Sequence, residues 1–348
     1  MAELLDRWMT VRQSGDRAWR PRTVKYHDDN MRLHIAPALG ERLADDVQPA
    51  DLSLFYASLA KKGLDDTSRH HVYATIRTAY SWAQRNDLVA RNPAMLLAKS
   101  ETPQERRRAR AVWTHEQVLR ALREASGELH QPPKSPQLVY GPLVLGAWAG
   151  LRCGEICGLR WSAVDLEAGG LFVARSLSQT KGGELDDLEP KTRAGTRWIP
   201  LSSQAAGVLR EHKRRQDELR MARGRRWNRE GWVICTAAGG PVKPSNLSSA
   251  WARFCRVHKL PPVRLHDLRH SFATAIFEQG GESMLVVVQT LLGHADPTIT
   301  TRTYLHMTPC KVAAAIAAQE AAIAAARDSL QDGHSEGTRV VALKGRKA

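Results

Sequence analysis

Two side chains that can bind phosphate lie three residues apart in the segment 264–270, whose sequence is RLHDLRH. On a helix, His266 and Arg269 would share one face, and an arginine beside a histidine can hold a phosphate group. The same pairing is also found on ordinary solvated helix faces. This segment alone therefore leaves a phosphate site and a plain polar face as open alternatives.

Arg152 stands between Gly150 and Gly154 in the sequence AGLRCGE. Glycines let the backbone turn tightly, and an arginine at the start of a helix would add its charge to the exposed amides there. Such a side chain is suited to an anion.

Three more polar residues each have a plain structural reading when taken singly. Lys191 falls in the polar connection between two predicted strands, where a lysine normally faces solvent. His294 follows Gly293 at a predicted helix end and could simply cap that helix. Tyr304 comes ten residues later and, taken alone, would be a core tyrosine. This set contains no pair of carboxylates, no Ser-His-Asp order and no glycine-rich phosphate loop.

In their order and approximate spacing, these residues match one known signature. The chain resembles the tyrosine recombinases, the phage integrase family that cuts and rejoins DNA through a tyrosine. The resemblance covers nearly the whole chain, and it is carried by the stretches GLRCGE, KTRAGTRWIPL, HDLRHSFAT and LLGHADPTITTRTY. It implies a site-specific DNA recombinase that works through a covalent 3′-phosphotyrosine intermediate.

The resemblance also implies a role for each matched residue. Arg152 and Arg269 would clamp the scissile phosphate, and Tyr304 would be the nucleophile. His266 would be the general acid and base. Glu155 would support the first arginine.

Two further roles follow in the same way. Lys191 would protonate the leaving 5′ oxygen, and His294 would be a hydrogen-bonding partner of the phosphate. Lys181 is a rival for the lysine role, but Lys191 has the better-matching K-T-x-x-x-x-R context.

The chemistry of these roles needs no cofactor and no metal. A tyrosine hydroxyl, with a pKa of about 10, is a weak nucleophile at neutral pH unless a base or nearby positive charge helps it. Two guanidiniums neutralise the charge that grows on the phosphate, and an ammonium protonates the leaving oxygen. The covalent intermediate stores the energy of the broken bond, so religation needs no ATP.

Composition agrees with a partner of negative charge. The 348 residues carry a net charge of +15, and the pI is near 10. Nucleic acid is the usual partner of so basic a chain, although a merely solvated surface stays open. No apolar run approaches the roughly 20 residues of a membrane span, and five scattered cysteines indicate free thiols and no zinc site. We expect a cytoplasmic, DNA-associated protein of bacterial or phage origin.

Periodicity predicts the elements that carry these residues. One helix would bury Leu52, Phe55, Tyr56 and Leu59, and the next would begin near Thr67 or Ser68. Two further helices are expected near 267–279 and 283–292, and short strands at 171–175, 196–201 and 232–235. Thr114 and Gln117 form a capping-box signature. The expected fold class is mainly α with a small antiparallel β-sheet (α+β).

Four segments are expected along the chain. They are a helical core DNA-binding domain at 1–98, a basic linker at 99–112, a catalytic domain at 113–328 that ends in an alanine-rich helix, and a polar tail at 329–348. Arginines on the second helix and in the linker are candidate DNA contacts: Arg69, Arg77, Arg106, Arg107, Arg108 and Arg110. The start of the chain leaves little room for an additional arm-binding domain.

The expected partner is double-stranded DNA with a specific recombination site and no membrane. The resemblance implies a homotetramer on paired sites, and it leaves open whether accessory DNA-bending or directionality proteins take part. The alanine-rich helix could pack on a neighbouring subunit or on its own domain. Alternative functions are a catalytically inactive DNA-binding regulator, a type IB topoisomerase-like enzyme and a metal-dependent nuclease.

Overall fold

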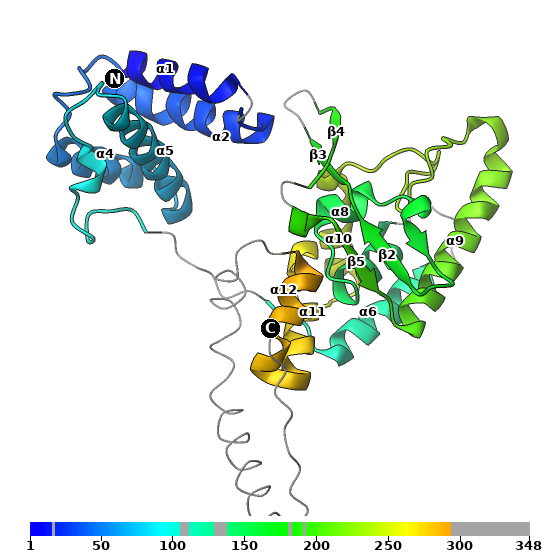
Figure 1. Cartoon of the computed structure of the whole chain (residues 1–348). Coiled ribbons are helices and arrows are strands. Elements are labelled where there is room, and N and C mark those ends of the chain that lie inside the picture. Colours follow the sequence, from blue (N-terminus) through cyan, green and yellow to red (C-terminus); the bar gives the residue numbers. More distant parts are fainter. Residues whose placement is uncertain (16–17, 105–110, 129–137, 180–182, 191–192, 294–348) are drawn as a thin grey trace, which may run out of the picture. The chain divides into compact units, whose positions relative to one another are not determined.

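The computed structural model describes residues 1–15, 18–104, 111–128, 138–179, 183–190 and 193–293. By its internal contacts the chain divides into two compact units (Figure 1). The first comprises Met1–Arg110 with Ser178–Asp186, and the second comprises Ala111–Leu177 with Asp187–Ala348. The four segments expected from the sequence stay a prediction, and the alanine-rich helix and the polar tail lie outside the described residues.

Helices around one aromatic-rich core make up most of the first unit. Leu5, Trp8, Ile35, Leu52 and Ile76 are fully buried in that core. The elements are α1 (Ala2–Gln13), α2 (Pro21–Asn30), a π-helical turn η1 (Met31–Ile35), α3 (Ala36–Leu39), α4 (Pro49–Lys61), α5 (Asp66–Arg85) and η2 (Pro93–Met95).

The two helices predicted in this unit are present. α4 buries the four apolar residues that its periodicity indicated. The predicted start of α5 was wrong by one or two residues, because Asp65 is the N-cap. Its carboxylate accepts a hydrogen bond from the backbone N–H of Ser68 at 2.7 Å, and an aspartate is a strong cap in that position.

Seven α-helices are described in the second unit. They are α6 (His115–Glu128), α7 (Tyr140–Ala147), α8 (Cys153–Gly158), α9 (Ser203–Arg223), α10 (Pro244–Val257), α11 (Leu268–Gly280) and α12 (Leu285–Leu292). Short 3₁₀ turns join them: η4 (Trp161–Ala163), η5 (Arg193–Gly195), η6 (Gly224–Arg226), η7 (Leu265–Asp267) and η8 (Gly281–Met284).

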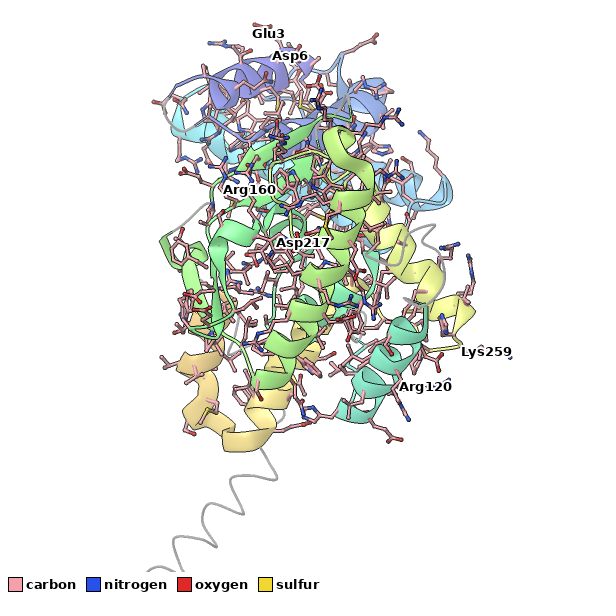
Figure 2. The ribbon with its side chains drawn as sticks, turned by 90° about the vertical axis from the view of Figure 1, so that its right-hand side faces the viewer. Glu3, Asp6, Arg120, Arg160, Asp217 and Lys259 are labelled. Carbon is pink, nitrogen blue, oxygen red and sulfur yellow. The ribbon has the colours of Figure 1, made fainter. Side chains whose placement is uncertain are left out.

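Polar contacts fix several of these helix ends. The predicted capping box at α6 is confirmed, since the Thr114 N–H donates to Gln117 and the Gln117 N–H donates to the Thr114 hydroxyl. Arg120 on α6 donates to the His258 carbonyl at 3.4 Å, so α6 lies beside the end of α10. In Figure 2, Arg120 and Lys259 accordingly lie close together.

The structure also describes two small antiparallel sheets. β1 (Val164–Asp165), β2 (Gly170–Val173) and β5 (Arg197–Pro200) form one sheet in the order β1-β2-β5. Phe172 pairs with Trp198, and Leu171 with Ile199. β3 (Ser176–Gln179) and β4 (Leu185–Leu188) form a two-stranded sheet inside the polar connection expected between the first two predicted strands.

One predicted strand is wrong. Residues 232–235 make only isolated bridges, from Trp232 to Arg160 and from Cys235 to Pro241. The reason is that the carbonyls of Trp232 and Val233 accept hydrogen bonds from the Gln216 side chain of α9, and not from a second strand. The predicted class, mainly helical with a small antiparallel sheet, is confirmed. Among the residues that the structure describes, no helix is long and apolar enough to cross a membrane.

Candidate active site

Arg152 lies where its flanking glycines predicted it, at the N-cap of α8. Gly150 has a φ of +65° and lies against Phe272, so close that a Cβ there would come within 2.5 Å of the ring. Gly154 is equally close to Ser176. These close contacts fix the turn that carries Arg152, whose side chain is 36% exposed. A solvent-reaching guanidinium is thus held on a rigid turn.

The carboxylate of Glu155 binds that guanidinium. It accepts the Arg152 backbone N–H at 2.9 Å and the Arg152 Nη1 at 2.7 Å. Arg197 on β5 donates to both oxygens of the same carboxylate, at 3.2 and 3.0 Å. Arg269 Nη1 lies 3.8 Å from Glu155 Oε2. One buried carboxylate therefore faces three arginines.

The arginines decide the charge of Glu155. Burial by itself would raise the pKa of this carboxyl. The Arg197 hydrogen bonds and the charges of Arg197, Arg152 and Arg269 outweigh burial and lower the pKa to about 2. Glu155 is therefore ionised at neutral pH, and three guanidiniums against one carboxylate leave a net charge of +2 in the cluster.

The C-terminal end of α12 meets the same three arginines. Arg197 Nε donates to the Leu291 carbonyl at 2.6 Å, Arg269 donates to the Leu292 carbonyl, and Arg152 Nη2 donates to the Gly293 carbonyl at 3.4 Å. The last carbonyls of a helix lack partners within the helix and carry the negative end of its dipole. Three successive carbonyls thus orient three guanidiniums, and α12 lies beside β5 (Figure 1).

His266 lies near this cluster, in the 3₁₀ turn η7 that leads directly into α11 at Leu268. The helix predicted near 267–279 also began after His266, and the shared face of His266 and Arg269 stays a prediction. Within this turn the Asp267 carboxylate binds Arg264 at 2.7 Å. Partial desolvation and then the positive charge of Arg269 lower the pKa of His266 below its usual value, which favours the neutral imidazole.

Several predicted site residues lie outside the described part of the chain. They are Lys191, its rival Lys181, His294, Tyr304, Arg106, Arg107, Arg108 and Arg110. The structure brings together Arg152, Glu155 and Arg269, and it puts His266 within reach of their charge. Among the residues that are described, no cluster of three His, Cys, Asp or Glu side chains could hold a metal. Independence from metal stays a prediction.

The two described candidate DNA contacts belong to the first unit. On α5, Arg69 forms an ion pair with Asp66, whereas the exposed guanidinium of Arg77 lies 5.9 Å from the centre of the Tyr73 ring. Of these two side chains, Arg77 is the exposed one, whereas Arg69 is already paired with a carboxylate.

No role was predicted for Arg197, although it is the arginine of the K-T-x-x-x-x-R context of Lys191. A signal was present, because side chains alternate along a strand and Arg197 shares the buried face of β5 with Ile199, opposite the exposed Trp198. A charged residue in a buried register requires a partner of opposite charge. Its occurrence in the stretch RWIP therefore pointed to a buried carboxylate.

Residues 107–310 match the family model described as "Phage integrase family". The chain belongs to that family. It is a tyrosine recombinase, a site-specific enzyme that breaks and rejoins DNA.

Relatives and solved structures agree with this assignment. The chain is 26% identical over 326 residues to "Tyrosine recombinase XerC-like" of Caldanaerobacter subterraneus, which covers 89% of the chain and 80% of the relative. It is 30% identical over 289 residues to "Tyrosine recombinase XerC" of Xylella fastidiosa, with coverage of 78% and 80%.

Two integrase structures share the fold. The Tn1549 transposon integrase in complex with a circular intermediate DNA matches with a TM-score of 0.75 at 19% identity, over 91% of this chain and 99% of that one. A lambda integrase tetramer bound to a Holliday junction matches with a TM-score of 0.60 at 18% identity, over 86% and 76%.

Proposed function

We propose that this recombinase cleaves one DNA strand through Tyr304, holds it as a covalent 3′-phosphotyrosine, and rejoins it to a different 5′ end without ATP or metal. The observation that carries the proposal is the arginine cluster, in which three guanidiniums face a single carboxylate. A fixed excess of positive charge suits a phosphodiester that becomes more negative as it is attacked.

Arg152 and Arg269 form the phosphate clamp in this account. Arg152 is 36% exposed and can donate directly to a nonbridging oxygen. Arg269 is 2% exposed and is anchored on the Gly150 and Leu292 carbonyls. It adds positive charge from the protein side, where the surroundings screen it little.

Proton transfers complete the reaction. As the Tyr304 oxygen bonds to phosphorus, its proton passes to the neutral His266, and the 5′ oxygen leaves with a proton from Lys191. The phosphate also accepts a hydrogen bond from His294. Religation runs in reverse, so the incoming 5′-hydroxyl returns a proton to Lys191 and His266 reprotonates the tyrosine. The lowered pKa of His266 favours the unprotonated imidazole, which is the form that can accept this proton.

The other five tyrosines are poorly suited to be the nucleophile. Burial raises the pKa of Tyr56, Tyr80 and Tyr140. Tyr73 is buried, and the Tyr26 hydroxyl donates to the His71 carbonyl at 3.4 Å. These features support Tyr304 by contrast.

The proposed partner is a DNA duplex with a specific recombination site. Arg77 and Arg69 of α5, with Arg106, Arg107, Arg108 and Arg110 of the linker, would contact its phosphates. The named assembly of lambda integrase, a tetramer on a Holliday junction, supports a homotetramer of this chain on paired sites. Its place of action would be the cytoplasm of a bacterium.

A covalent-trapping assay in EDTA tests the proposal. Nicked duplexes are first selected from the DNA flanking the gene by their binding to the wild-type chain. Wild type should then form a denaturation-resistant adduct on the 3′ phosphate, and Tyr304→Phe should bind equally well and form none. Equal adduct formation by Tyr304→Phe would contradict the nucleophile assignment. Specific binding without an adduct from wild type would overturn the covalent mechanism.

Product topology separates recombination from topoisomerase activity. Wild type should join two cognate sites and leave a supercoiled plasmid that lacks the site unchanged. Relaxation of any supercoiled plasmid would favour the type IB topoisomerase alternative.

A further inference from the structure

Arg197 is buried beside the phosphate clamp, yet it cannot contact a phosphate. Its side chain is 4% exposed, and it makes four hydrogen bonds to protein atoms. The acceptors are the two oxygens of Glu155 and the carbonyls of Gly195 and Leu291. An arginine with these partners adds its charge to the cluster but makes no contact with the phosphate, so any further effect on the reaction passes through its neighbours.

We propose that Arg197 is a positioning residue, which holds Glu155 so that Arg152 points its guanidinium at the scissile phosphate. This inference rests on the proposed function. It assigns a role in the reaction to a side chain outside the six catalytic residues and Glu155.

The hydrogen bonds to the two oxygens of Glu155 support this role. Glu155 Oε1 accepts from both Arg152 Nη1, at 2.7 Å, and Arg197 Nη1, at 3.2 Å. Oε2 accepts from the Arg152 backbone at 2.9 Å and from Arg197 Nη2 at 3.0 Å. The two-pronged contact with Arg197 fixes the plane of the carboxylate, because both oxygens are held from the β5 side. Arg152 therefore meets its partner in one orientation.

The balance of charge around Glu155 also supports a positioning role for Arg197. With Arg197 in place, the single negative charge of Glu155 is shared among Arg197, Arg152 and Arg269. Without Arg197, the carboxylate would be balanced mainly by Arg152. Arg152 already pairs with Glu155 at 2.7 Å, and it would then neutralise a larger share of that carboxylate and offer less positive charge to DNA. Arg197 thus keeps Arg152 available for the phosphate.

The end of α12 is held by the same side chain. Arg197 Nε donates to the Leu291 carbonyl at 2.6 Å, and Gly293, with a φ of +61°, packs on the Arg197 stem. A Cβ at Gly293 would come within 3.2 Å of Arg197 Cδ and 2.5 Å of the Ala194 carbonyl oxygen. Since Arg152 also donates to the Gly293 carbonyl, Arg197 positions a second anchor of the clamp.

Lysine cannot reproduce these contacts. The acceptors lie on three sides of a planar fork, namely the carboxylate, the η5 carbonyl and the α12 carbonyl. An ammonium on a flexible stem would keep a charge near Glu155 but lose the fixed plane. Arg197→Lys should therefore be intermediate between wild type and an uncharged substitution.

The test compares two substrates that differ in phosphate charge. One nicked duplex carries the normal phosphodiester. The other carries a methylphosphonate, in which a methyl group replaces one nonbridging oxygen and removes the negative charge. A variant whose defect lies in the arginine clamp should be impaired on the charged substrate and close to wild type on the neutral one. A variant with a general structural defect should be impaired on both.

Single-turnover adduct formation is measured for wild type, Arg197→Met, Arg197→Lys and the control Arg214→Met. Arg214 is an exposed, ion-paired arginine on α9, the helix that carries Asp217 in Figure 2. We expect Arg197→Met to bind the duplex normally and to react about 100-fold more slowly with the phosphodiester. Its rate with the methylphosphonate should lie within about twofold of wild type.

The remaining outcomes are also decisive. Arg197→Lys should be about tenfold slower on the phosphodiester only. If Arg197→Met loses its far-UV circular dichroism, the comparison of Arg197→Lys with wild type tests the positioning role. Arg214→Met should match wild type. Equal losses on both substrates, or no loss on either, would overturn the positioning role and leave the proposed function standing. Failure of wild type to form any adduct would overturn both.

Discussion

Two buried titratable groups, one in each unit, have a pKa below its usual value for opposite reasons. In the first unit, burial lowers the pKa of His27 to about 4. Its ring stacks on Trp19 at 4.5 Å and meets the edge of Trp8 at 5.0 Å, and its Nδ1 lies 3.0 Å from the Thr75 hydroxyl. In the second unit, arginines lower the pKa of Glu155 to about 2 despite burial.

The His27 cluster contributes to the stability of the fold, whereas the Glu155 cluster also contributes positive charge to the reaction. Around His27 the fold removes water and the imidazole stays neutral, so its contribution is packing. Around Glu155 the fold supplies more positive charge than the carboxylate needs, and the excess is available to a phosphate. Substitutions should therefore affect stability in the first cluster and both stability and chemistry in the second.

The largest expected effect is the loss of cleavage rate when Arg152 or Arg269 of the second cluster is replaced. Arg152→Ala and Arg269→Ala should each slow adduct formation by about 1,000-fold, because each removes charge that meets the growing negative charge on the phosphate. Only Arg269→Ala should also destabilise the fold strongly, by about 3 kcal/mol, because it removes a buried charge that faces Glu155 and takes a donor from the buried Gly150 and Leu292 carbonyls. Urea unfolding, read together with single-turnover cleavage, measures both quantities.

Equal stability losses for Arg152→Ala and Arg269→Ala would show that exposure does not distinguish the two side chains. Arg152 is 36% exposed against 2% for Arg269, so water should replace its lost contacts. Arg214→Ala serves as the control that should change neither stability nor cleavage by a measurable amount.

A medium effect is expected from the pH dependence of Glu155. Its folded pKa is about 2 and lies below the unfolded value near 4.3, so the stability it contributes is complete above about pH 5 and is lost as the pH falls toward 2. The whole loss should be about 3 kcal/mol, of which about 1.7 kcal/mol falls between pH 6 and pH 3. Glu155→Gln should remove this component, and the difference in urea unfolding free energy between wild type and variant, measured from pH 6 to pH 3, reports that part of it. A difference that does not change with pH would contradict the arginine account.

A smaller effect is expected at His27, in a different pH window. The folded pKa is about 4 and the unfolded value is near 6.5, so its contribution is complete above about pH 6.5 and is lost as the pH falls through 4. Between pH 7 and pH 5 we expect a loss of about 2 kcal/mol. Hydrogen exchange of α1 and α2 in wild type, His27→Gln and the control His34→Gln measures it. Identical pH profiles for wild type and His27→Gln would show that His27 is not the titrating group.

Much of this architecture could be predicted from the sequence, because the apolar periodicity of α4 and α5 is strong and local. The start of α5 and the absent strand at 232–235 could not, because side chains decided them: Asp65 outcompetes Thr67 and Ser68 as a cap, and Gln216 occupies the carbonyls of residues 232 and 233. Both depend on contacts that no period reveals.

At the candidate site, Arg152 and Glu155 are three residues apart, so their relation could be predicted from the chain. The role of Arg197 depends on β5 lying beside both α8 and α12, which are far apart in the sequence. Local spacing could not predict that arrangement.

The most direct test of the central claim is to identify the amino acid that carries the DNA. The adduct formed in EDTA on the nicked duplex is digested with protease and nuclease, and the nucleotide-bearing peptide is sequenced by mass spectrometry. The account predicts a single modified residue, Tyr304, linked to the 3′ phosphate, among the six tyrosines of the chain. A nucleotide on any other residue, or on the 5′ phosphate, would contradict it.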